Sequence, residues 1–252
     1  IYYLFEYKIK KILMKNIVNK NCIESLKGST DPIIIVAAVR EAEAIAYACY
    51  DNNIKIDSFC DTEKRKTIDK FCGKNVIHTP EIKNYYKNAS FIIASQHIED
   101  VADQLNSMGY DKLYSALELL ENFDLNAHKY LISNEYMNSR VSVYKKTHEA
   151  YFNKEYTYMR SLDVMVTTKC SLKCESCSNL MQYYKSASNM TYEKIINSIE
   201  NICKNVDDIS EFRIIGGEPL MNKDWAKIID GILDRNPKRK VFIYTNGTIP
   251  PK

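Results

Sequence analysis

The chain has 252 residues, of which 45% are hydrophobic and 27% are charged, and its formal net charge is +3. This length and composition are typical of one large or two smaller globular domains, and the small net charge gives no electrostatic reason to expect nucleic-acid or membrane binding. No apolar run approaches the roughly 20 residues that a membrane-spanning helix needs.

The N-terminal stretch IYYLFEYKIKKILMKNIV is apolar but is interrupted by Glu6, Lys8, Lys10 and Lys11, so it lacks the apolar core of a signal peptide. Met14 is the expected native start. Without an export signal, the eight cysteines are expected to lie in a reducing cytosol, where clustered cysteines indicate metal or catalytic sites. We therefore predict a cytoplasmic protein.

Residues 30–120 alternate between strand and helix patterns. An alanine-rich stretch at 41–50 and an amphipathic stretch from Ile98 to its glycine stop at Gly109 predict helices. Apolar runs of buried-strand type predict strands at 33–37, 54–60, 91–95 and in DKLYSA. This alternation predicts an α/β domain whose parallel sheet is covered on both faces.

This first domain resembles Rossmann-like nucleotide-binding domains. Asp61 ends the second predicted strand 20 residues after Glu41, roughly where the ribose-binding acid of that fold lies. The phosphate loop reads AAVREAEA rather than G-x-G-x-x-G, and alanine side chains would keep a pyrophosphate off the backbone, although Arg40 could contact a phosphate. Two hypotheses remain: a nucleotide site, or a domain that keeps the fold and has lost or changed its ligand, which we favour.

Residues 121–159 are polar and aromatic and are interpreted as a helical linker. Residues 160–252 then show a βαβαβ pattern, with strands in SLDVMVTTKC, EFRIIGGEP and VFIYTNGT and with Thr191 as the N-cap of the first helix. A polar or glycine motif follows each strand. In parallel α/β barrels that end of the strands carries the active site.

The first of these motifs places Cys170, Cys174 and Cys177 in a C-x3-C-x2-C loop. Three thiolates on a tight loop can hold one face of an iron–sulfur cubane and leave its fourth iron open to a small molecule. A zinc loop, or three unrelated packed cysteines, is the alternative. Cys203 is predicted to be a core residue, and so are the cysteines of the first half, Cys22, Cys49, Cys60 and Cys72.

The second motif is GGEP, from Gly216 to Pro219, and the third contains Thr245 and Asn246. Two glycines at a strand end let a ligand approach the backbone closely, and Glu218 adds a carboxylate suited to an ammonium group. Ordinary turns are the alternative for both motifs.

Together, and in this order, the motifs resemble the radical S-adenosylmethionine (radical SAM) superfamily, over about residues 161–248. The resemblance implies that Cys170, Cys174 and Cys177 bind a 4Fe-4S cluster and that S-adenosylmethionine binds its fourth iron. It implies that an electron from the cluster cleaves S-adenosylmethionine to a 5′-deoxyadenosyl radical, which abstracts hydrogen from an unknown small-molecule or peptide substrate. The implied cofactor contacts are Gly216, Gly217, Glu218, Pro219, Thr245 and Asn246, and the implied electron donor is a flavodoxin or ferredoxin.

Two features depart from the family pattern. Ser176 stands where family members carry an aromatic residue, so the usual packing on adenine is not expected from this position. Only three of the six usual barrel strands are present, so we predict the first three βα units of a partial TIM-type barrel in a truncated chain. The alternative functions are a non-catalytic nucleotide- or sugar-nucleotide-binding module with an inert half-barrel, and a zinc-stapled structural domain.

Overall fold

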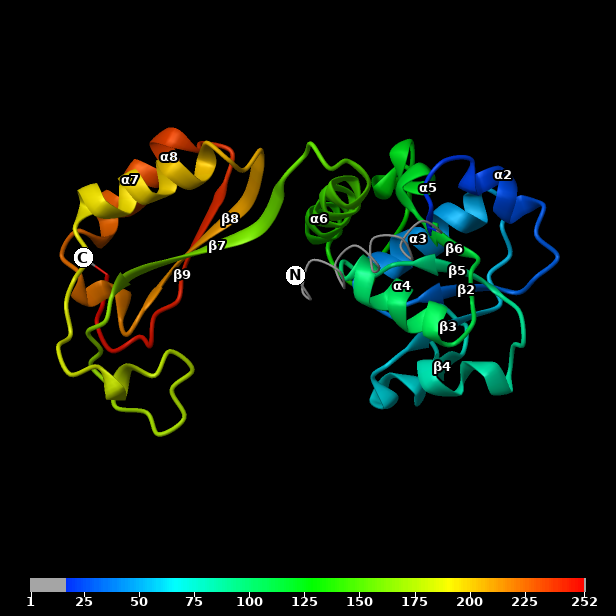
Figure 1. Ribbon diagram of the computed structural model, residues 1–252, viewed down its shortest axis with the longest axis horizontal. Coiled ribbons are helices and arrows are strands. Elements are labelled where there is room, and N and C mark those ends of the chain that lie inside the picture. The colour runs from blue at the N-terminus through cyan, green and yellow to red at the C-terminus, as the bar shows by residue number, and fades with distance from the viewer. Residues whose placement is uncertain (1–16, 252) are drawn as a thin grey trace, which may run out of the picture. The chain divides into compact units, whose positions relative to one another are not determined.

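The computed structural model describes residues 17–251 (Figure 1), so the predicted start at Met14 and the terminal Lys252 lie outside the described residues. The chain forms two compact units, one ending at Phe152 and the other beginning at Asn153. Each is described by itself below. Within the described residues, no helix combines the length and the hydropathy that crossing a membrane requires.

The first unit contains a six-stranded parallel sheet in the order β1-β6-β5-β2-β3-β4. Its strands are β1 (Ile17–Val18), β2 (Ile33–Val36), β3 (Ser58–Asp61), β4 (Val76–His78), β5 (Ser90–Ile93) and β6 (Leu113–Ser115). The order reverses between β2 and β5, as in doubly wound sheets. The sequence prediction missed β1 and β4, because strands of two and three residues carry too little periodicity to be recognised.

Helices cover both faces of this sheet, as predicted (Figure 1). Ile33 and Ile35 of β2 pack into a core with α3 (Arg40–Asp51), whereas Ile34 and Val36 pack into a second core with α4 (Ile98–Ser107). The remaining helical segments of the unit are α2 (Cys22–Lys27), η2 (Lys64–Thr67), η3 (Thr79–Asn84), α5 (Leu117–Glu121), η4 (Leu125–Ala127) and α6 (Asn134–Phe152).

The prediction of a separate linker at 121–159 is wrong for α6, which belongs to the first unit. Tyr144 is fully buried, and its hydroxyl donates to Ile93 O at 2.8 Å and accepts from Ala116 N at 2.9 Å. Arg140 forms an ion pair with Glu41 of α3 at 2.9 Å. These contacts fix α6 on α3 and on the carboxyl ends of β5 and β6.

His148 of α6 is fully buried. Its Nε2 lies 2.9 Å from Ser95 O, which can only accept, so Nε2 carries the proton and Nδ1 accepts from Ser115 Oγ at 2.9 Å. Burial lowers the pKa of His148 to about 4, because the charged imidazolium would lose its hydration.

We expect acid to destabilise the first unit through this histidine. In the unfolded chain His148 takes up a proton below about pH 6.5, so its contribution to stability is complete above that pH and is lost as the pH falls towards 4. The free energy of unfolding of the first unit is expected to be about 2 kcal/mol lower at pH 5 than at pH 8. Urea unfolding followed by circular dichroism should show it, and His148→Gln should reduce the pH dependence. Equal pH dependence in both proteins would contradict the expectation.

The second unit is a three-stranded parallel sheet in the order β7-β8-β9, which confirms the predicted βαβαβ pattern. Its elements are β7 (Tyr158–Thr167), η5 (Met181–Tyr183), α7 (Tyr192–Cys203), β8 (Asp208–Gly216), η6 (Pro219–Met221), α8 (Trp225–Arg235) and β9 (Lys240–Ile243). Thr191 caps α7 as predicted, since its side chain accepts from Lys194 N. Both helices pack on one face of the sheet, around Val164, Phe212 and Ile214 (Figure 1).

Candidate functional site

One pocket of about 490 Å³ collects residues from all three motifs of the second unit. The loop after β7 contributes Cys170, Cys174 and Cys177, and the end of β8 contributes Gly216 and Gly217. The loop after β9 adds two of the predicted contacts, Thr245 and Asn246. These groups meet because the carboxyl ends of parallel strands lie at one edge of a sheet.

The three cysteines carry free thiols, with Cys174 exposed and the other two partly exposed. Among residues 17–251, no three His, Cys, Asp or Glu side chains are grouped tightly enough to hold a metal ion. The three cysteines thus line one pocket, but their sulfur atoms are not close enough together to hold a single metal ion.

Cys177 differs electrostatically from the cysteines outside the loop. The N–H groups of Met181, and then of Asn179 and Leu180, point to its sulfur and lower the pKa of the thiol, although partial desolvation opposes them. Burial instead raises the pKa of the other shifted thiols, which are Cys22, Cys49, Cys60, Cys72 and Cys203. Accessible thiols, one of them with a lowered pKa, fit a group that binds thiolate ligands. The prediction that the other five are packed residues agrees with the structure, in which Cys22, Cys49 and Cys60 are buried. Cys72 and Cys203 are partly buried and pack against the cores of their units.

The two glycines let the chain that enters the cysteine loop lie directly on β8. A Cβ atom at Gly216 would lie 2.4 Å from Thr167 O, and one at Gly217 would lie 2.2 Å from Lys169 O. Gly217 N donates to Thr167 O at 3.1 Å, and Glu218 N donates to Lys169 O at 2.8 Å. The close approach that the sequence indicated is therefore made by the protein's own backbone.

Glu218 does not face the pocket, contrary to the prediction that its carboxylate meets an ammonium group. Its side chain is fully buried and accepts hydrogen bonds from Leu220 N, Thr245 Oγ1 and Asn246 N. Pro219 is also buried and begins η6 outside the pocket. Neither residue contacts the pocket that the motif surrounds.

Sequence reasoning missed a charged pair on the wall of the pocket. Asp163 of β7 and Arg213 of β8 are opposite each other in the sheet, with Arg213 Nε 2.6 Å from Asp163 Oδ1. Burial would lower the pKa of Arg213, but the charge of Asp163 and a hydrogen bond with Tyr244 raise it. The signal was present in the strands, because both residues alternate with the core residues Val164, Phe212 and Ile214.

Residues 164–252 match the family model described as the Radical SAM superfamily. The match begins within β7 and contains the cysteine loop and both other motifs. This part of the chain is a radical SAM domain. The predicted resemblance is thereby confirmed, and the domain is one found in enzymes.

Curated relatives support the same assignment. A GTP 3',8-cyclase of Actinobacillus pleuropneumoniae serotype 5b is 32% identical over 98 residues, which is 38% of this chain and 27% of that protein. Probable GTP 3',8-cyclases of Methanocella arvoryzae and Methanococcus maripaludis are 34% and 35% identical over 89 and 99 residues, or 35% and 37% of this chain. The matched segment covers 27% and 30% of those two proteins, so this chain spans less than a third of each relative.

In the first unit, outside the radical SAM domain, the predicted ribose contact Asp61 is bound by the protein's own groups. Asp61 accepts from Ala38 N and Lys66 Nζ through Oδ2, both at 2.9 Å, and from Glu63 N through Oδ1 at 2.8 Å. Glu41 is 1% exposed and is held by Arg140 and by Gln96 Nε2. Asp61 is 3% exposed, so its carboxylate is not open to a ribose.

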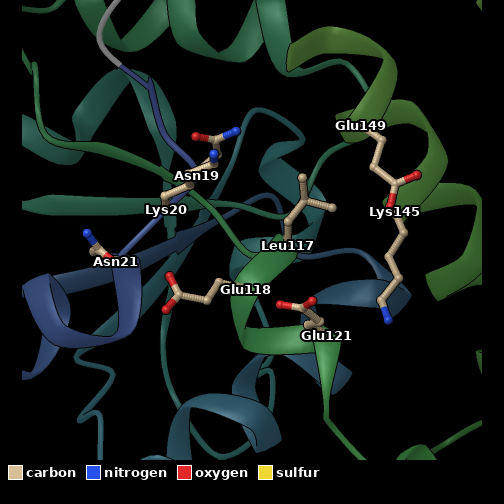
Figure 2. A pocket seen from close by; sticks show the side chains of 8 residues that line it. All are labelled: Asn19, Lys20, Asn21, Leu117, Glu118, Glu121, Lys145 and Glu149. Carbon is tan, nitrogen blue, oxygen red and sulfur yellow. The ribbon is translucent and has the colours of Figure 1, made fainter. Parts of the chain in front are cut away.

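A different pocket of this unit, also of about 490 Å³, lies beside α5 and α6 (Figure 2). It is lined by Asn19, Lys20, Asn21, Leu117, Glu118, Glu121, Lys145 and Glu149. The carboxylate of Glu118 accepts from Cys22 N at 2.6 Å. Mixed lysines and glutamates of this kind are typical of a solvated surface.

We therefore expect the intact chain to bind NAD only weakly, with a dissociation constant above about 1 mM. The loop after β2 lacks phosphate-binding glycines, and the Asp61 carboxylate is engaged on both oxygens. Isothermal titration calorimetry with NAD, and with a UDP-sugar as the second nucleotide class, measures this directly. Micromolar binding of either ligand would contradict the expectation and favour a nucleotide-binding module.

Proposed function

We propose that this chain contributes the cluster- and cofactor-binding part of a radical SAM enzyme. Cys170, Cys174 and Cys177 would hold a 4Fe-4S cluster, and S-adenosylmethionine would lie against Gly216 and Gly217. The observation that carries the proposal is the single pocket that the cysteine loop shares with the ends of β8 and β9. The match of residues 164–252 to the superfamily supports it.

When bound, the cluster supplies the electron that cleaves S-adenosylmethionine reductively to a 5′-deoxyadenosyl radical for hydrogen abstraction. The chain's own residues hold the cysteine loop in place and shape the wall of the pocket. Gly216 and Gly217 let the cysteine loop lie on β8, and the Gly216 carbonyl accepts from Asn179 Nδ2 at 2.9 Å. Tyr244 and Ile215 add apolar surface to the wall of the pocket.

The substrate and the electron donor are proposed only as broad classes. The relatives are named for a reaction of GTP, but this chain spans less than a third of them, so we carry over only the chemistry of the shared domain. We propose a small-molecule or peptide substrate and a flavodoxin- or ferredoxin-type donor. Because that chemistry needs a reductant, we propose the cytoplasm as the site of action.

Anaerobic reconstitution tests the proposal. The 252-residue chain is incubated with iron and sulfide, desalted, and analysed for iron, acid-labile sulfide and zinc. We expect about four irons and four sulfides per chain, and an assay for 5′-deoxyadenosine with S-adenosylmethionine and dithionite follows. Zinc without sulfide would favour a structural zinc loop, and the absence of both metals would favour a non-catalytic module.

A further inference from the structure

Asn246 lies in the loop after β9, directly beside the first cysteine. Its Nδ2 is 3.7 Å from Cys170 Sγ and 3.2 Å from Ser171 Oγ, and it donates to both. The second interaction of the sulfur is with Leu172 N, at 3.4 Å and within the cysteine loop itself. Asn246 therefore connects the third strand end to a thiol that the first strand end carries.

The orientation of the Asn246 amide follows from its partners. Its Oδ1 accepts from Thr248 N at 3.0 Å and from Thr248 Oγ1 at 2.7 Å. A backbone N–H can only donate, so the amide oxygen must face Thr248 and the NH₂ group must face Cys170. A hydrogen bond of 2.5 Å between Ser171 Oγ and Thr248 Oγ1 also joins the cysteine loop to the loop after β9.

Glu218 holds the backbone of this loop. Its Oε2 accepts from Asn246 N at 2.8 Å, and its two oxygens accept from Thr245 Oγ1 at 2.9 and 3.0 Å. Leu220 N adds a third donor at 3.0 Å, and the side chain is fully buried. A buried carboxylate with three donors is a strong, directional anchor, since charge-assisted hydrogen bonds are about twice as strong as neutral ones.

We propose that Glu218 is a positioning residue that holds Asn246 so that its amide donates to the Cys170 sulfur and raises the reduction potential of the cluster bound there. This inference rests on the proposed function. Reduction adds an electron to the cluster, so its sulfur ligands become more negative and an N–H donor stabilises the reduced form more than the oxidised form. Hydrogen bonds to cluster sulfurs are among the main means by which proteins set such potentials.

The test compares reduction midpoint potentials of the reconstituted 252-residue chain, without S-adenosylmethionine. The reduced cluster is counted by electron paramagnetic resonance during titration with dithionite. Asn246→Ala should make one-electron reduction about tenfold less favourable, a shift of about 59 mV to more negative potential. Asn205→Ala is the matched control, because its side chain donates to Asn201 O on α7, outside the pocket, and it should leave the potential unchanged.

Glu218→Gln separates positioning from direct contact. It removes the charge that holds Asn246 N, so the potential should move in the same direction, and the double variant should show no larger shift than Asn246→Ala alone. Full iron content in Asn246→Ala with an unchanged potential would overturn the inference and leave the proposed function standing. A shift in Glu218→Gln that adds fully to that of Asn246→Ala would also overturn it. Failure of the wild-type chain to take up iron and sulfide would instead overturn the proposed function and this inference with it.

Discussion

Replacing Cys174 with alanine is expected to abolish cluster binding while leaving the radical SAM domain folded. Two thiolates cannot hold the three irons of an open cubane, so iron and sulfide should fall to background after anaerobic reconstitution. The side chain is exposed, and truncating an exposed side chain changes stability by less than about 0.5 kcal/mol. Iron and sulfide analysis and urea unfolding, followed by the fluorescence of Trp225, measure the two effects separately.

Cys203→Ala is the matched control for this prediction. Cys203 ends α7 and packs against the core of the same unit, away from the pocket. The Cys203→Ala variant should keep the full content of iron and sulfide. If Cys174→Ala kept its iron and its brown absorbance, the assignment of the cysteine loop as the cluster-binding site would be incorrect.

The elements that the sequence predicted well are those whose periodicity is set by burial. Ile33 to Val36 form an unbroken apolar run because both faces of β2 are covered. The helix α4 ends at Ser107, and Gly109, with a φ of +83°, turns the chain away just beyond it, as the sequence predicted. The role of α6 was missed although a signal existed. Met137, Val141, Tyr144 and His148 are its buried residues, and they recur at the spacing of one helix face. The polar residues between them hid this stripe.

The site shows a different limit. The cysteine spacing could be recognised because three ligands lie in one loop, which is a local property of the sequence. The hydrogen bonds of Glu218 could not be predicted from the sequence. Its partners Thr245 and Asn246 lie 27 and 28 residues away and come close to it only when β9 pairs with β8. Likewise, the sequence suggested that Gly217 makes room for a ligand, whereas the neighbour that needs this room is the backbone of Lys169.

That neighbour makes Gly217→Ala the substitution with the largest expected effect on stability. The added Cβ would lie 2.2 Å from Lys169 O and 2.7 Å from Cys170 Cβ, and neither is the flexible end of a side chain. Relief of this overlap must move the cysteine loop away from β8 and break the hydrogen bond from Glu218 N to Lys169 O. We expect the radical SAM domain to lose about 3 kcal/mol or more.

Gly247→Ala separates this steric effect from the loss of conformational freedom. Gly247 has a φ of +73° but no atom within 4 Å of its would-be Cβ, so alanine there should cost only about 1 kcal/mol. Trp225 is the single tryptophan of the chain and lies in α8, so its fluorescence during urea unfolding reports on this domain alone. The Gly217 variant should unfold at a much lower urea concentration than the Gly247 variant and should take up less iron. Equal midpoints for the two variants would mean that the cysteine loop does not lie as closely on β8 as the structure shows.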